Sequence, residues 1–135
     1  MIFTSYNKRG RIQLIIKSEG KNMFKIIRKY IFNRCRAIEE NEISYNKAIS
    51  LQKKGAILID VRSPKEYSEG HLKGAILIPE YEIKEKILQR INNKEKEIIV
   101  YCQSGVRAKK ASETLKKMGY NSVYNIYNGL DNIYV

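Results

Sequence analysis

The sequence has few of the residues that build metal centres and disulfide frameworks. It contains one histidine, His71, and two cysteines, Cys35 and Cys102, in 135 residues. Two cysteines form at most one disulfide, which excludes a disulfide-rich secreted scaffold. One histidine and two distant cysteines also lack the spacing of zinc ligands. We therefore predict no metal site.

Long hydrophobic runs are missing as well. A transmembrane helix needs roughly 20 consecutive apolar residues, and the sequence has no such run. The apolar stretch Met23–Phe32 contains three basic residues and is not followed by a small-residue cleavage site, so it is a poor signal peptide. We expect no transmembrane segment and a location in the reducing cytoplasm.

Acidic residues are outnumbered, with 14 Asp and Glu against 26 Lys and Arg and a formal net charge of +12. Residues 1–40 hold ten of the basic and three of the acidic side chains. A basic protein can bind nucleic acid, but no nucleic-acid motif accompanies this charge. The abundant Ile, Lys, Asn and Tyr are typical of translation from an A+T-rich genome. We predict attraction for small anions and no nucleic-acid partner.

From about residue 43 onward, short apolar runs alternate with amphipathic stretches, which is typical of strands alternating with helices. The runs that predict buried strands are residues 56–61, 75–78, 98–101 and 123–127. This alternation predicts one α/β domain with a mainly parallel central sheet and helices on both faces. In such sheets, sites form at the carboxyl ends of the strands.

Local signals mark the helices. Ser44 is placed to cap a helix over residues 45–54, and Ser63 to form a capping box with Glu66. Two further helices are predicted from apolar faces at Ile83, Ile87, Leu88 and Ile91, and at Ala108, Ala111, Leu115 and Met118.

The first 40 residues do not follow this pattern. Residues 1–22 are expected to be a tail or an incorrectly assigned start, and residues 23–40 a basic amphipathic segment. That segment is expected to pack on the domain, with contact to an anionic membrane as the alternative. The domain itself is expected to span residues 41–135.

The expectation of a later start depends on the genetic code. Codons for Glu19 and Gly20 can spell a purine-rich ribosome-binding sequence upstream of Met23. The alternative is a translated segment, in which Ile12–Ile16 could form an added edge strand.

One loop carries the chemistry. It connects the strand 98–101 to the next helix and consists of Cys102, Gln103, Ser104, Gly105, Val106 and Arg107. A loop at this place points successive backbone N–H groups inward and makes an anion site at the helix N-terminus. These groups, with Arg107, would stabilise a thiolate at Cys102. The alternative, an ordinary buried cysteine, does not explain the glycine and arginine at this spacing.

Cations crowd the start of the helix that follows. Arg107, Lys109 and Lys110 lie where the helix dipole favours acidic side chains. This arrangement is mildly destabilising unless an anion binds there, so it supports the predicted anion site.

Together these segments resemble the rhodanese family. Cys102–Arg107 is similar to the active loop of that family, and Asp60–Tyr67, Gly70–Ala75 and Ile78–Pro79 resemble its other recognisable stretch. The resemblance covers roughly residues 43–130. It implies that Cys102 carries sulfane sulfur as a persulfide, and that Arg107 and the loop amides hold the transferred group.

The resemblance implies a sulfurtransferase with two half-reactions and no cofactor. The donor would be thiosulfate or another persulfide, and the acceptor cyanide, a small thiol or a protein thiol. Gln103 is a departure, because many members have a basic residue at this position. A neutral side chain there weakens the attraction for a dianion. Asn128 and Gly129 replace a usual pair of glycines.

Four polar residues after the first long strand are expected to be mainly architectural. Arg62 and Glu66, four residues apart, are expected to pair with each other. Asp60 and Arg62 are kept as supporting residues near the site, and His71 has no predicted role in a relay to the thiol. Cys35 is expected to be incidental, with a resolving thiol as the alternative.

Two other functions remain open at the level of sequence. Cysteine-dependent phosphatases and arsenate reductases use a loop closing on arginine, but theirs is one residue longer than the four residues between Cys102 and Arg107. The second is a rhodanese-like binding module without activity, which the presence of Cys102 disfavours.

Overall fold

The computed structural model describes residues 2–6, 12–16 and 39–133, and the chain divides into two compact units, Met1–Arg36 and Ala37–Val135. In the first unit, β1 (Ile2–Tyr6) and β2 (Ile12–Ile16) pair antiparallel with Ile2 opposite Ile16. They form a two-stranded sheet of their own. The added edge strand considered for Ile12–Ile16 is therefore not part of the larger sheet.

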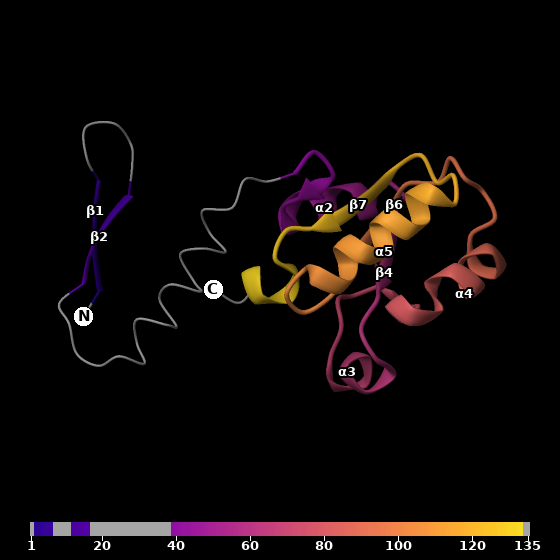
Figure 1. Ribbon diagram of the computed structural model, residues 1–135, viewed down its shortest axis with the longest axis horizontal. Helices are drawn as coiled ribbons and strands as arrows, with labels where there is room; N and C mark the ends of the chain where they lie inside the picture. Colours follow the sequence, from indigo (N-terminus) through magenta and orange to yellow (C-terminus); the bar gives the residue numbers. More distant parts are fainter. Residues whose placement is uncertain (1, 7–11, 17–38, 134–135) are drawn as a thin grey trace. The chain divides into compact units, whose positions relative to one another are not determined.

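The second unit is a sheet-and-helix domain (Figure 1). Its five strands lie in the order β3-β7-β6-β4-β5, and all neighbours are parallel. The strands are β3 (Glu42–Ile43), β4 (Ile57–Asp60), β5 (Ile76–Leu77), β6 (Ile98–Tyr101) and β7 (Val123–Ile126). The helices are α2 (Tyr45–Lys53), α3 (Pro64–Glu69), α4 (Ile83–Arg90) and α5 (Val106–Lys117), with 3₁₀ turns η1 (Glu80–Glu82) and η2 (Gly129–Asn132). The predicted α/β class with a parallel sheet is confirmed.

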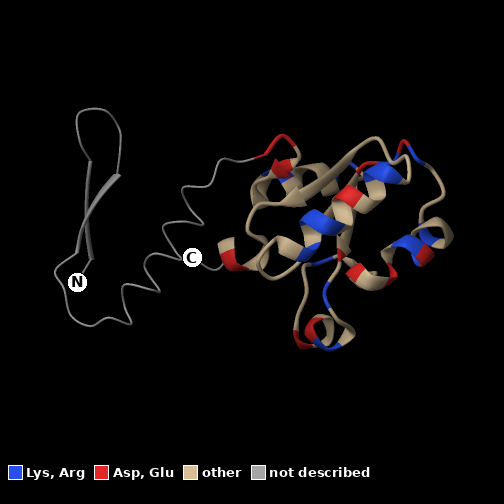
Figure 2. Ribbon diagram, in the orientation of Figure 1, with Lys and Arg blue, Asp and Glu red and all other residues tan. Residues whose placement is uncertain are grey.

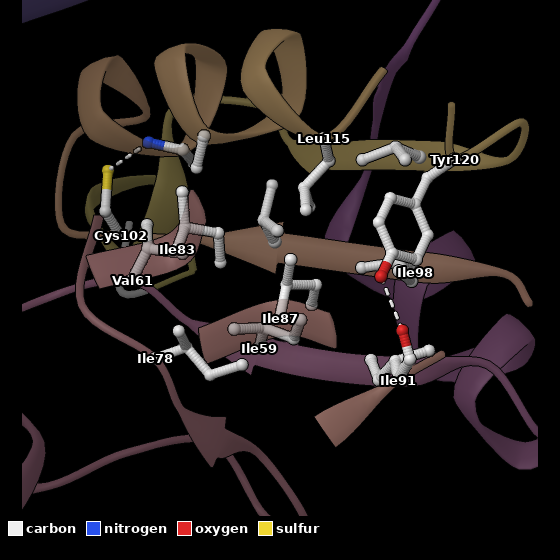
Figure 3. Packing of buried hydrophobic residues seen from close by; sticks show 14 residues of the cluster. Ile59, Val61, Ile78, Ile83, Ile87, Ile91, Ile98, Cys102, Leu115 and Tyr120 are labelled. Carbon is white, nitrogen blue, oxygen red and sulfur yellow. Dashed lines mark hydrogen bonds between the residues drawn. The ribbon is translucent and has the colours of Figure 1, made fainter. Parts of the chain in front are cut away.

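Buried side chains form one cluster on each face of the sheet. One cluster joins β4 and β6 to α4 and α5, and Figure 3 shows its packing around Ile87 and Leu115. The other joins β4, β6 and β7 to α2 and η2. Successive residues of β6, and Cys102 directly after it, alternate between the two clusters, because side chains of an extended chain point to opposite faces. Ile98, Val100 and Cys102 belong to the α5 side, while Ile99 and Tyr101 belong to the other.

The predicted caps are confirmed. Ser44 Oγ accepts a hydrogen bond from Lys47 N at 3.2 Å, and Ser63 and Glu66 form a complete capping box. One apolar position differs, because Leu88 on α4 is 49% exposed whereas Ile87 is buried. Only a narrow stripe of this short helix meets the sheet. Within the described residues, no helix is both long enough and apolar enough to span a membrane.

The topology places two strand ends side by side. β4 and β6 are neighbours, and Asp60 lies opposite Tyr101 at the carboxyl end of each strand. The segment after Tyr101 and the segment after Asp60 therefore leave the sheet at the same edge.

Candidate active site

Cys102 is the first residue of the loop that connects β6 to α5. Its side chain is fully buried. The Sγ atom accepts hydrogen bonds from Gly105 N at 3.1 Å and Ala108 N at 3.4 Å, the second of which is drawn in Figure 3. Two backbone N–H dipoles thus point at the sulfur from the N-terminus of a 12-residue helix. This geometry favours a thiolate or another anionic sulfur species.

Gly105 makes the turn possible. Its φ of +95° lies in the left-handed region, which glycine adopts without a Cβ penalty. An added Cβ would also lie 3.3 Å from the backbone of Asn128. The predicted need for glycine at this position is confirmed.

The loop is braced from behind by η2. Leu130 N donates to Cys102 O at 3.0 Å, and Asp131 N donates to Gln103 O at 2.9 Å. Gln103 Nε2 also donates to Asp131 Oδ1 at 2.8 Å. Sequence reasoning missed this brace, since it assigned only a turn to Asn128 and Gly129.

The outward side of the loop carries no charge. Gln103 and Ser104 are exposed, and Val106 is 73% exposed. The exposed side chains between Cys102 and Arg107 are therefore all neutral.

Arg107 forms a bidentate ion pair with Glu66. Its Nη1 donates to Glu66 Oε2 and its Nη2 to Glu66 Oε1, both at 2.7 Å. Because of these hydrogen bonds, the pKa of Glu66 is well below its usual value and the pKa of Arg107 is raised. Arg107 is thus engaged by a carboxylate of the protein itself. Electrostatic interaction with Cys102 is a smaller contribution to the raised pKa of Arg107.

The expected pairing of Arg62 with Glu66 is wrong. Arg62 instead donates to Asp60 Oδ2 from Nη2 at 2.7 Å and to the carbonyl oxygen of Gly70 at 2.6 Å. Asp60 is fully buried and also accepts from the backbone N of Arg62. The hydrogen bonds that Arg62 donates to Asp60 are the main reason that the pKa of Arg62 is raised.

A buried tyrosine completes this cluster. The hydroxyl of Tyr101 accepts a hydrogen bond from Leu72 N at 3.0 Å. Burial raises the pKa of Tyr101. Asp60, Arg62 and Tyr101 therefore hold the chain at Gly70 and Leu72, on the opposite face of the sheet from Cys102. This arrangement supports the architectural role predicted for Asp60 and Arg62.

The other cations at the start of α5 also have acidic partners. Lys110 pairs with Glu80 at 2.8 Å, and Lys109 pairs with Glu39. Over residues 39–133 the chain has 16 basic and 13 acidic side chains, and Figure 2 shows both signs on α3, α4 and α5. The positive excess of the described domain is therefore small, and bound anions are not needed to balance the cations at the start of α5.

The remaining candidates lie apart from the loop. His71 stacks on Tyr67 at a centroid distance of 3.7 Å, and its Nδ1 lies 2.9 Å from the carbonyl oxygen of Tyr67. Among the described residues, no group of three or more His, Cys, Asp or Glu side chains is placed to hold a metal ion. Cys35 lies outside the described residues.

Comparison with known proteins identifies similar chains. A sequence model of the Rhodanese-like domain matches residues 44–134. The thiosulfate sulfurtransferase PspE of Escherichia coli (strain K12) is 43% identical over 67 residues, which cover 50% of this chain and 64% of PspE. The tRNA uridine(34) hydroxylase of Enterobacter sp. (strain 638) is 28% identical, over 89% of this chain and 39% of the hydroxylase. The chain thus spans less than two thirds of either relative.

Solved structures with a similar fold include small single-domain proteins. A rhodanese with anions from E. coli is 38% identical with a TM-score of 0.54, covering 58% of this chain and 91% of the other. The human single-domain sulfurtransferase TSTD1 is 26% identical with a TM-score of 0.60, covering 67% of this chain and 92% of the other.

Proposed function

This chain belongs to the rhodanese-like domain family, and from this premise we propose that it is a sulfurtransferase that carries sulfane sulfur as a persulfide on Cys102. One observation carries the proposal: the Cys102 sulfur accepts hydrogen bonds from two backbone N–H groups at the start of α5. Such donors stabilise the thiolate that attacks and the persulfide that forms. The similarity to the thiosulfate sulfurtransferase PspE also supports it.

In the first half-reaction, the Cys102 thiolate attacks the outer sulfur of thiosulfate or another sulfane donor. A new sulfur–sulfur bond forms at Cys102, the donor bond breaks, and sulfite or a thiolate leaves with the electron pair. In the second, an acceptor such as cyanide, a small thiol or a protein thiol attacks the outer sulfur, and the Cys102 thiolate is restored. The shared covalent intermediate gives ping-pong kinetics. No organic cofactor or metal is required by this exchange.

Within the proposal, the loop residues Gln103 to Arg107 bind the transferred group and Asp60 and Arg62 support the neighbouring segment. We also propose the cytoplasm as the location, since a reducing compartment keeps the thiol free. The hydroxylase relatives are matched over only 39% of their length, so their activity is not transferred to this chain.

The test is mass spectrometry after incubation with thiosulfate. The wild-type protein should gain about 32 Da, one sulfur atom, on the peptide that contains Cys102. Cys102→Ser should gain no mass, because a hydroxyl does not hold sulfane sulfur. It should keep the melting temperature of the wild type. Cys35→Ser is the matched control and should load like the wild type.

Two outcomes would contradict the proposal. A sulfur adduct retained by Cys102→Ser would assign the carrier to another residue. No adduct on the wild type from any sulfane donor would favour a binding module over an enzyme.

A further inference from the structure

Glu66 occupies both ends of the Arg107 guanidinium. The two hydrogen bonds at 2.7 Å leave neither Nη atom without a carboxylate partner. The same carboxylate accepts from the backbone N and the hydroxyl of Ser63, at 3.0 and 2.9 Å. Glu66 is therefore fixed by the start of α3, and its negative charge is a permanent part of the site.

A second carboxylate lies at the other end of the loop. Asp131 is exposed and accepts a hydrogen bond from the Gln103 side chain at 2.8 Å. Its backbone N is bound to the Gln103 carbonyl at 2.9 Å, so the carboxylate stays beside the loop. Between the two acids, the loop exposes the neutral side chains of Gln103, Ser104 and Val106.

From this arrangement we propose that Glu66 and Asp131 determine which sulfur donors the site accepts, favouring donors with one negative charge or none over the doubly charged thiosulfate. The inference rests on the proposed function. A dianion bound at the thiol must either displace Glu66 from Arg107 or bind next to a carboxylate that repels it. Both lower the affinity for the dianion. A donor with one charge is repelled less, and the loop amides are sufficient to bind it. Glu66 is thus a positioning residue, acting on the donor through Arg107.

The donor class this predicts is a monoanionic or neutral sulfane compound, such as an organic persulfide or a thiosulfonate. With an organic persulfide, the Cys102 thiolate attacks the outer sulfur, the sulfur–sulfur bond of the donor breaks, and the organic thiolate leaves with the electron pair. One sulfur atom moves and no other oxidant or reductant takes part.

Thiosulfate and methanethiosulfonate are suitable probes. They have similar size and both present an outer sulfur on a tetrahedral sulfur centre, but methanethiosulfonate has one negative charge fewer. The measured quantity is the ratio of kcat/KM for thiosulfate to kcat/KM for methanethiosulfonate, with cyanide as acceptor. A ratio cancels losses of folded protein, so a purely structural role does not change it.

Glu66→Gln is the principal variant, because glutamine at this position keeps the capping box with Ser63. Asp131→Asn removes the second charge without changing α3. Each variant should raise the ratio about three- to tenfold, the effect of one partly screened charge. Glu113→Gln is the control, since it removes one exposed negative charge from the same helix as Arg107 and should leave the ratio within about twofold.

A ratio that stays at the wild-type value in every variant that folds would overturn the inference. If the wild type forms a Cys102 persulfide from both donors, that result leaves the sulfurtransferase proposal intact. If the wild type forms none from either donor, the proposed function itself fails, and the two failures are therefore distinguishable.

Discussion

The backbone of Gly129 is packed directly against the carbonyl group of Cys102. A Cβ added at Gly129 would lie 2.2 Å from the Cys102 oxygen and 2.7 Å from the Gln103 oxygen. Backbone atoms cannot move aside as the end of a side chain can. The contact allows Leu130 N to reach the Cys102 carbonyl at 3.0 Å.

Gly129→Ala should therefore destabilise the domain by about 2–4 kcal/mol and reduce sulfur loading of Cys102. Urea unfolding and mass spectrometry measure the two effects. Gly119→Ala is the matched control, since Gly119 also has a positive φ, of +93°, but its Cβ would meet no atom within 4 Å. It should cost about 1–2 kcal/mol, from backbone strain alone, and should not affect loading. Equal losses of stability would show that contact with the loop is unimportant.

Arg107→Ala should reduce kcat/KM for thiosulfate about tenfold or more, and reduce it less for an uncharged donor. The variant removes the guanidinium that offers paired donors to an anion, and it leaves the Glu66 carboxylate beside the loop without its cation. Steady-state kinetics with both donors test this. Equal losses for the two donors would mean that Arg107 only supports the loop.

The position of the proposed nucleophile, Cys102, could be predicted because its signals are local. The apolar run before Cys102 and the helical pattern after Gly105 place the cysteine at a strand–helix junction, and parallel sheets put sites there. The capping box of Ser63 and Glu66 was predictable for the same reason, since it spans four neighbouring residues.

Contacts between distant segments could not be predicted. Glu66 and Arg107 are 41 residues apart, and only the packed positions of α3 and α5 bring them together. The helical spacing of Arg62 and Glu66 favoured an ion pair between these two residues, but Arg62 pairs with the buried Asp60 instead. The strand β3 and the turn η2 are too short to produce a periodic pattern.

Tyr101→Phe should destabilise the domain by about 1–3 kcal/mol, because the buried backbone N–H of Leu72 loses its acceptor. Urea unfolding at neutral pH measures the change. Tyr81→Phe is the control, since Tyr81 is 67% exposed, and it should leave stability within about 0.5 kcal/mol.

The effect of Tyr101 should also depend on pH. Burial raises the pKa of Tyr101 above its usual 10.0, so above pH 10 the unfolded chain releases a proton that the folded chain retains. The raised pKa therefore contributes stability that is fully present below pH 10 and is lost as pH rises beyond it. The stability difference between wild type and Tyr101→Phe should shrink above pH 10. A difference that does not change with pH would contradict the buried, protonated hydroxyl.

Removal of residues 1–22 should leave the domain stable and active. In the part of the chain that the structure describes, β1 and β2 pair with each other, whereas the five-stranded sheet takes all its strands from residues after 41. The braces of the loop, at Glu66 and Asp131, lie in that later part as well. A chain that starts at Met23 should therefore keep the melting temperature and the sulfur-loading rate of the full chain, as measured by calorimetry and mass spectrometry.

A melting point lower by several degrees, equivalent to roughly 1–2 kcal/mol for a domain of this size, would show that the segment stabilises the domain. In that case the domain begins earlier than residue 41, and Ile12–Ile16 becomes the first segment to examine by substitution.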